Sequence, residues 1–227
     1  MLGHRAESGF LDLAVLDSTD PGAVLSRAES LDPGRTLFIV STKSGGTVET
    51  FSFMKYFFNL AARKLGTREA GRHFLAITDP GSALADLARA HGFRHVFLND
   101  PEIGGRYSAL SCFGLVPAAL IGTDPGRLLD RAAEAAGAEA EGAGRMNGAA
   151  LGALLGQFAR RGRDKLTFVF SPQLGAFGDW VEQLLAESTG KEGKGILPVA
   201  GEALGPPEVY GDDRIFCSIR LAGDAAE

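Results

Sequence analysis

The sequence has 227 residues, of which 45% are hydrophobic and 22% charged. This length allows one large or two small domains, each with its own core. The formal net charge of −5 provides no basic field for nucleic acid or anionic lipid, so any anion must be bound at a local site. No apolar run approaches the roughly 20 residues of a membrane-spanning helix. We therefore expect a cytoplasmic globular protein with neither nucleic acid nor a membrane as partner.

Short apolar runs alternate with longer helical patterns through the first half of the chain. This alternation predicts an α/β fold, with parallel sheets that carry helices on both faces. The apolar character of the strands is continuous, which suits a sheet buried on both sides. The expected strands are residues 11–16, 36–40, 74–78 and 94–98, and the expected helices are residues 22–31, 47–65, 82–91 and 109–121.

The second half of the chain begins with a stretch rich in Ala, Gly, Glu and Arg, which predicts a helical connection with a break near residues 142–144. A second α/β unit follows. No covering helix follows the last expected strand and residues 1–9 contain no element, so we expect a fragment. The expected second-unit strands are 166–170, 196–199 and 214–220, with a helix over 176–187. The expected domains are a first lobe at 1–125, the connection at 126–163 and an incomplete second lobe at 164–227.

Cysteine and histidine positions give little chemical information. Cys112 and Cys217 lie within apolar runs, so we expect two buried, reduced thiols, with a disulfide as the less favoured alternative. The four histidines are scattered without the spacing of metal ligands. We therefore predict no metal site.

The first candidate site is Thr42-Lys43-Ser44-Gly45-Gly46-Thr47, which joins an expected strand to an expected helix. Backbone N–H groups, hydroxyls and a lysine at the positive end of a helix dipole can hold a phosphate without a metal. The Gly-Lys-Ser/Thr ending of a nucleotide-binding loop is missing. A tight turn with Thr47 as helix N-cap explains the same residues. Phosphate binding and a plain turn both remain open at this point.

The second candidate site lies within residues 99–108, again between an expected strand and an expected helix. Gly104 and Gly105 allow a close approach to the backbone, and Arg106 adds a permanently charged donor fork. The alternative is a surface turn in which Arg106 pairs with Asp100 or Glu102.

The third candidate site lies at the end of the expected helix 176–187. Glu187 is placed where the helix dipole opposes a negative charge, which makes it a candidate base. The alternative is a solvated helix end that is capped by Gly190 and complemented by Lys191 and Lys194.

Together the three segments closely resemble the phosphoglucose isomerases, and Gly104-Gly105-Arg106-Tyr107-Ser108 is the most specific of them. Residues 13–21 and 184–199 are similar to the isomerase part of bifunctional transaldolase/glucose-6-phosphate isomerase proteins. The resemblance covers nearly the whole chain. It implies the sugar-isomerase (SIS) fold, a three-layer α-β-α architecture in two lobes, with the substrate between them and no metal or redox cofactor. A fused transaldolase domain and a homodimer are left open.

The resemblance also implies roles for individual residues. Arg106, beside Gly105, would steady the charge on an enediol, and Glu187 would move the proton between C1 and C2 of the sugar. Such chemistry interconverts glucose 6-phosphate and fructose 6-phosphate through a cis-enediol. The implied phosphate ligands are Thr42, Lys43, Ser44 and Thr47, and Gln183 is the implied further substrate contact.

Two departures from the family pattern limit what the resemblance implies. The family has a glycine-glycine-serine turn upstream of residue 42, and a ring-opening histidine and a catalytic lysine toward the C-terminus, and this sequence contains none of them. We therefore expect these 227 residues to be weak or inactive by themselves. A phosphosugar-binding module without catalysis is the alternative function.

Overall fold

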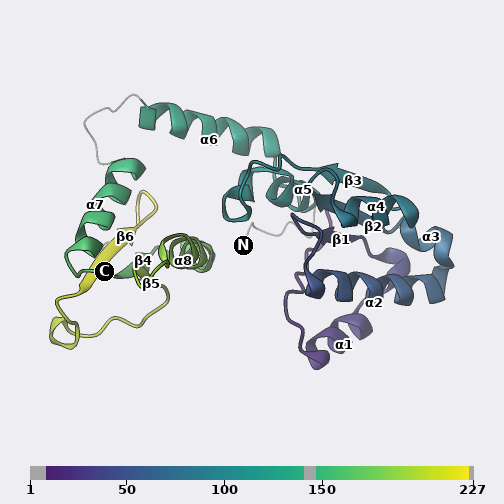
Figure 1. Cartoon of the computed structure of the whole chain (residues 1–227), viewed down its shortest axis with the longest axis horizontal. Helices are drawn as coiled ribbons and strands as arrows, with labels where there is room; N and C mark the ends of the chain where they lie inside the picture. The colour runs from purple at the N-terminus through teal and green to yellow at the C-terminus, as the bar shows by residue number, and fades with distance from the viewer. Residues whose placement is uncertain (1–8, 141–146, 225–227) are drawn as a thin grey trace. The chain divides into compact units, whose positions relative to one another are not determined.

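The computed structural model describes residues 9–140 and 147–224. Within these residues the chain divides into two compact units, residues 9–129 and 130–224 (Figure 1). Helix α6, Pro125–Ala140, spans the division. The three-part division into domains that the sequence suggests stays a prediction.

The first unit is built on a three-stranded parallel sheet in the order β1-β2-β3. The middle strand is buried along all five of its residues. Phe38 lies beside Phe74, and Leu75 beside His95, in the two registers. A strand buried in this way must be apolar throughout, which is why its sequence does not alternate. The strands are β1, Phe38–Ser41; β2, Phe74–Thr78; and β3, His95–Leu98.

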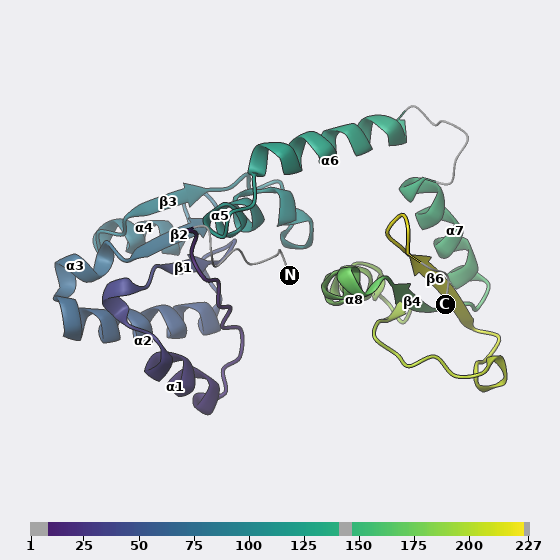
Figure 2. The same cartoon turned by 180° about the vertical axis from the view of Figure 1, so that it is seen from behind.

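Helices cover both faces of this sheet, which Figure 2 shows from behind. Phe74 and Ala76 pack into the main core with the helices that lie between the strands in sequence. Leu75 and Ile77 face the other side because strand side chains alternate, and there α5 packs on β2. The helices of this unit are α1, Pro21–Ser30; α2, Val48–Leu65; α3, Thr67–Gly71; α4, Ala83–Ala90; and α5, Cys112–Leu120, with short 3₁₀ segments at Pro33–Arg35 and Gly105–Leu110.

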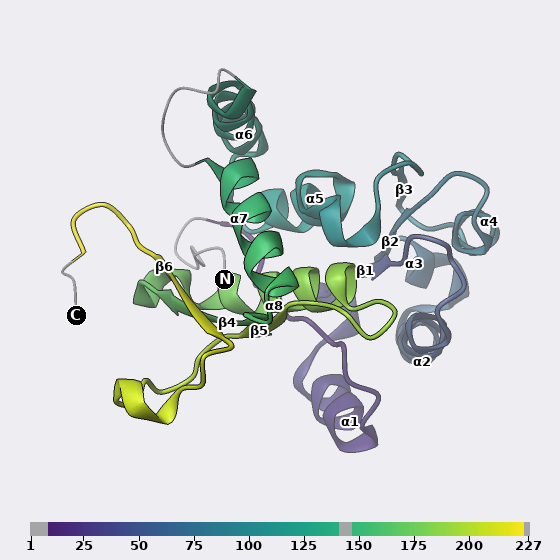
Figure 3. The same ribbon diagram turned by 60° about the vertical axis from the view of Figure 1, so that its left-hand side comes forward.

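The second unit carries another three-stranded parallel sheet, in the order β5-β4-β6 (Figure 3). Its core joins Leu166 and Phe168 of the middle strand to Leu155 of α7 and Val181 of α8. Both units therefore have the predicted class of fold. The elements are α7, Gly148–Arg160; β4, Lys165–Phe170; α8, Gly175–Thr189; β5, Leu197–Val199; and β6, Arg214–Ile219, with 3₁₀ segments at Pro172–Leu174 and Pro207–Val209.

The strand expected over residues 11–16 is wrong, because this segment has no regular structure. Only Leu16 of its apolar residues packs against the main core, and Leu13 and Val15 are exposed. Leu11 N donates to Leu120 O at 3.0 Å, so the segment contacts the end of a helix instead of a strand. An apolar run becomes a strand only where another strand can pair with it.

Other expectations have mixed outcomes. Cys112 and Cys217 are free thiols as predicted, but they are half-buried rather than buried. The break expected near residues 142–144 lies outside the described residues, as does most of the segment 1–9 that was expected to lack an element. No described helix is long and apolar enough to cross a membrane.

Candidate functional site

Two of the three candidate segments lie at one edge of the first sheet. Residues 42–47 follow β1, and residues 99–111 follow β3. The carboxyl ends of parallel strands meet at the same edge, which is where α/β sheets bind ligands. Asp79 follows β2 at this edge as well, between the two segments.

Hydroxyl groups in the turn after β1 contact one another. Thr42 is buried, and its Oγ1 lies 3.1 Å from Thr47 Oγ1. Thr47 is the N-cap residue of α2, the position that the plain-turn alternative gives it, but its side chain makes no capping hydrogen bond. The start of α2 therefore has no side-chain acceptor at its cap, an arrangement suited to an anion.

The turn packs closely against the start of α4. Gly45 has φ +67°, and a Cβ there would lie 2.9 Å from Leu84 N and 3.0 Å from Ser82 Cβ. Glycine is required for both reasons, the left-handed backbone and the missing space. Ser44 Oγ accepts from Gly46 N at 3.3 Å, which closes the tip of the turn.

Beneath the turn, Lys43 connects all three strand ends. Its carbonyl oxygen accepts from Asp79 N at 3.1 Å and from Thr78 Oγ1 at 3.2 Å. Its Nζ donates to Asp79 Oδ2 at 2.6 Å and to Pro101 O at 2.7 Å. The Lys43 ammonium is therefore held by protein groups, the carboxylate of Asp79 and the carbonyl oxygen of Pro101.

The segment after β3 is organised at its base by Asn99, which is buried. Asn99 Oδ1 accepts from Cys112 N at 3.2 Å, which closes the loop onto the first residue of α5. Arg106 is half-buried in the 3₁₀ segment Gly105–Leu110. A Cβ at Gly105 would meet nothing within 4 Å, so the space beside this backbone is open to a ligand.

The third candidate segment lies on α8 in the second unit. Gln183 and Glu187 are both exposed and are four residues apart, so they share one face of the helix. Thr189 Oγ1 donates to Leu185 O at 2.7 Å and accepts from Ile196 N at 2.9 Å, which fixes the helix end beside Glu187. An amide and a carboxylate thus stand together on one exposed helix face.

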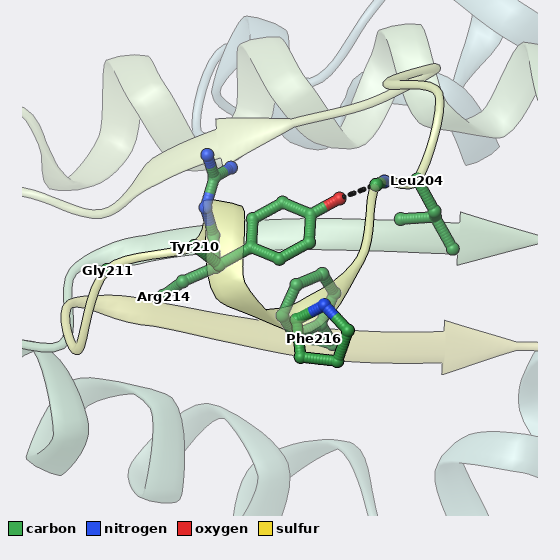
Figure 4. A pocket seen from close by; sticks show the side chains of 7 residues that line it. Leu204, Tyr210, Gly211, Arg214 and Phe216 are labelled. Carbon is green, nitrogen blue, oxygen red and sulfur yellow. Dashed lines mark hydrogen bonds between the residues drawn. The ribbon is translucent and has the colours of Figure 1, made fainter.

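A cavity of about 320 Å³ lies elsewhere in the second unit (Figure 4). Tyr210 Oη accepts from Gly205 N at 2.7 Å, and the Arg214 guanidinium lies 5.4 Å from the Tyr210 ring centroid. Arg214 also donates to Thr167 Oγ1 at 2.8 Å and to Glu202 Oε2 at 3.2 Å. These polar groups bind one another, and none of the predicted site residues lines the cavity. Its lining residues are Leu204, Gly205, Pro207, Tyr210, Gly211, Arg214 and Phe216.

Asp79 and Asn99 make hydrogen bonds at the carboxyl ends of the strands but are not among the residues predicted for the site. The sequence of residues 79–82 indicates a turn with a helix N-cap, and Ser82 does cap α4 by accepting from Ala85 N at 3.2 Å. The signal for Asp79 is its position directly after a buried strand, the same position that marks Thr42 and Asn99.

The fold and this strand edge define a class: an α/β protein with parallel sheets whose hydroxyl- and glycine-rich turn before a helix suits an anionic small molecule. The sequence profile of the phosphoglucose isomerase family matches residues 2–196. The chain therefore belongs to the phosphoglucose isomerase family. The resemblance seen in the sequence is confirmed.

Two relatives illustrate the extent of the match. A glucose-6-phosphate isomerase of Thermus thermophilus is 33% identical over 234 residues, covering 95% of this chain and 53% of the relative. One of Thermosynechococcus vestitus is 40% identical over 196 residues, covering 80% of this chain and 35% of the relative. The chain thus spans about a third to a half of the length of these relatives.

Solved structures agree on the fold. A hypothetical protein from Thermus thermophilus matches with a TM-score of 0.72 and 30% identity, over 89% of this chain and 51% of that one. A glucose-6-phosphate isomerase from Chlamydia trachomatis matches with a TM-score of 0.65 and 28% identity, over 80% of this chain and 35% of that one. The predicted α/β fold of the family, with parallel sheets and helices on both faces, is confirmed.

Proposed function

We propose that this chain takes part in the interconversion of glucose 6-phosphate and fructose 6-phosphate. The observation that carries the proposal is the family match over residues 2–196, which includes every site residue predicted from the sequence. The relatives' names supply the reaction, and the residue types suit it. The substrate is a sugar phosphate bound by local groups, as the acidic net charge requires.

Glu187 acts as the base in the proposed mechanism. Aldose–ketose exchange moves one proton between C1 and C2, so a single carboxylate can accept it from one carbon and return it to the other through a cis-enediol. Gln183 lies one turn earlier on the same face of α8, where an amide can hold a substrate hydroxyl.

The first unit supplies charge stabilisation and phosphate binding. Arg106 places a permanent cation beside the oxygen that becomes negative in the enediolate, and Gly105 keeps the approach open. The hydroxyls of Thr42, Ser44 and Thr47 and the N-terminus of α2 hold the phosphate, which positions the sugar for proton transfer.

Replacing the base tests this mechanism. We expect Glu187→Gln to lower kcat by about 10³-fold, because general base catalysis contributes about 10²–10⁴-fold, while the affinity for fructose 6-phosphate changes little. Turnover is measured by a coupled assay and binding by calorimetry in the complete product of its gene, and the parent 227-residue chain is assayed beside it. Glu182→Gln, an exposed glutamate on the same helix, is the matched control and should retain turnover. Normal turnover by Glu187→Gln would refute the assignment.

The same measurements separate the alternative function. A phosphosugar-binding module would bind fructose 6-phosphate with no turnover even in the complete gene product.

We propose weak or absent turnover for the 227 residues alone, since they span only a third to a half of the length of the relatives. A fused transaldolase domain and a homodimer stay predictions. The cytoplasm remains the proposed compartment, in keeping with two free thiols.

A further inference from the structure

The ion pair between Lys43 and Asp79 lies at the centre of the hydrogen bonds that join the carboxyl ends of β1, β2 and β3. The Lys43 side chain is 32% exposed and that of Asp79 13% exposed, so this pair is more buried than the exposed ion pairs of the same unit. Asp79 Oδ1 is buried and has no hydrogen-bond partner among the described residues. The Lys43 ammonium is therefore the main compensation for the Asp79 charge, and losing either partner leaves a desolvated charge.

The same ammonium also holds the loop that carries Arg106. Pro101 O accepts from Lys43 Nζ at 2.7 Å, although the two residues are 58 positions apart. Two consecutive turns join Pro101 to Arg106: Ile103 N donates to Asp100 O at 3.2 Å, and Tyr107 N donates to Gly104 O at 2.9 Å. A displacement of Pro101 therefore reaches Arg106 through two short, hydrogen-bonded turns.

Lys43 is itself part of the turn at residues 42–47, which we call the phosphate turn, so it connects this turn to the Arg106 loop. Its carbonyl oxygen is held from β2 by Thr78 and Asp79, so its backbone belongs to the turn while its side chain reaches the loop after β3. One residue thus sets the separation between the hydroxyl-rich turn at residues 42–47 and the segment that carries Arg106.

We propose that Asp79 and Lys43 are positioning residues for the isomerase reaction. Asp79 fixes the Lys43 ammonium, the ammonium fixes Pro101 O, and the Arg106 loop is thereby held at the right distance from the phosphate turn. We call the two hydrogen bonds of the ammonium, to Asp79 and to Pro101 O, the tie. The Lys43 side chain acts through the tie and not as a phosphate ligand. This inference rests on the proposed function for its kinetic part and on the hydrogen bonds alone for its structural part.

The test compares Asp79→Asn, Lys43→Met and their double variant in the complete gene product. Each single change should lower kcat by about 10–100-fold, since displacing a catalytic group by about 1 Å can cost 10²-fold. The double variant should be no worse than the worse single variant, because both changes break one unit. Lys43→Arg keeps the charge and donors and should recover part of the loss.

A matched control is available in the same unit. Lys64 Nζ lies 2.7 Å from Asp32 Oδ1, a distance close to that of the Lys43 pair, but both side chains are about half exposed and the pair lies away from the strand ends. Lys64→Met should leave kcat within about twofold of the parent, as expected for an exposed ion pair.

Coupling to the arginine separates positioning from general damage. In an Arg106→Ala background, Asp79→Asn should lower kcat by less than about twofold further, because the arginine that the tie positions is already absent. If the two losses multiply in full, the tie does not act through Arg106 and the inference is overturned.

The phosphate-ligand alternative gives the opposite result for Asp79. If the ammonium bound phosphate directly, Asp79→Asn would release it and preserve or tighten fructose 6-phosphate binding, while Lys43→Met alone would weaken it. That pattern overturns the proposal. Parallel losses of kcat in both variants, with fructose 6-phosphate affinity little changed, support it.

A readout independent of activity distinguishes the two levels of inference. Hydrogen exchange of residues 99–107 should become faster in Asp79→Asn and Lys43→Met but not in Lys64→Met. Unchanged exchange overturns the tie, whatever the activity. Failure of the proposed function would show in the parent protein itself, as no turnover and no fructose 6-phosphate binding, and the exchange measurement would still decide the tie.

Discussion

Gly45 is the residue of the turn at residues 42–47 with the least freedom to change. Its backbone is left-handed, and the atoms nearest a new Cβ include the backbone nitrogens of Leu84 and Ala83, which cannot rotate away. We expect Gly45→Ala to lower the free energy of unfolding by about 2–4 kcal/mol through strain and overpacking. Urea unfolding of the variant measures this loss.

The same substitution at Gly105 is its matched control. Gly105 has open space beside it and no left-handed backbone, so Gly105→Ala should change the free energy of unfolding by less than about 0.5 kcal/mol. It should instead weaken fructose 6-phosphate binding, if the space serves the ligand. Equal destabilisation at both positions would contradict this distinction.

At the scale of elements, the pairing of β4 with β6 gains an ion pair. Lys165 Nζ donates to Asp213 Oδ2, and this hydrogen bond lowers the pKa of Asp213 below its ordinary value of 3.8 and raises the pKa of Lys165 above 10.5. Asp213, whose pKa is lowered, stabilises the fold above pH 3.8, and this stabilisation is lost as the pH falls through the pKa of the folded state. Lys165, whose pKa is raised, stabilises the fold below pH 10.5, and this stabilisation is lost as the pH rises through the pKa of the folded state.

The expected outcome is a small stability difference confined to a pH window. Asp213→Asn should lower the free energy of unfolding between about pH 4 and pH 10, and the difference from the parent should shrink outside that window. Lys165→Met should give the same profile. Denaturant unfolding over a pH series measures it, and a difference that is constant with pH would rule out the ion pair as its cause.

The elements differ in how well the sequence predicts them. The strand expected over 74–78 agrees with β2 residue for residue, because a strand buried on both faces is marked by its own composition. Residues 11–16 have similar apolar composition but form no strand, since no neighbouring strand accepts their backbone hydrogen bonds. Composition sets the preference of a segment, and pairing decides whether it is realised.

At the scale of the whole molecule, each unit buries a hydrophobic core of its own. Phe74 is 1% exposed and its ring lies 4.6 Å from that of Phe38, while Leu166 is 1% exposed in the second core. We expect Phe74→Ala to cost about 3–5 kcal/mol and Leu166→Ala about 2–5 kcal/mol.

Hydrogen exchange can test whether the two cores are independent. Phe74→Ala should speed exchange within residues 9–129 only, and Leu166→Ala within residues 130–140 and 147–224 only. Faster exchange across both units in either variant would show that the units unfold together.

The sequence predicts the segments of the candidate site but not the side-chain contacts within them, because its signals are local and the contacts depend on the fold. The three segments stand out because strand, glycine-rich turn and helix follow one another along the chain, and those signals are local. Thr47 is predicted as a helix cap, yet its hydroxyl lies against Thr42. The hydroxyl partner is set by how the turn folds back, which the order of residue types does not specify.

The sequence by itself determined the α/β class, most of the strands and helices, and the family, since these depend on local composition and on motifs in order. Only the tertiary structure decided where the Lys43 ammonium goes. Its partners, Asp79 and Pro101, are 36 and 58 residues away. They meet Lys43 because three parallel strands end at one edge in the order β1-β2-β3, and strand order and register are properties of the folded sheet.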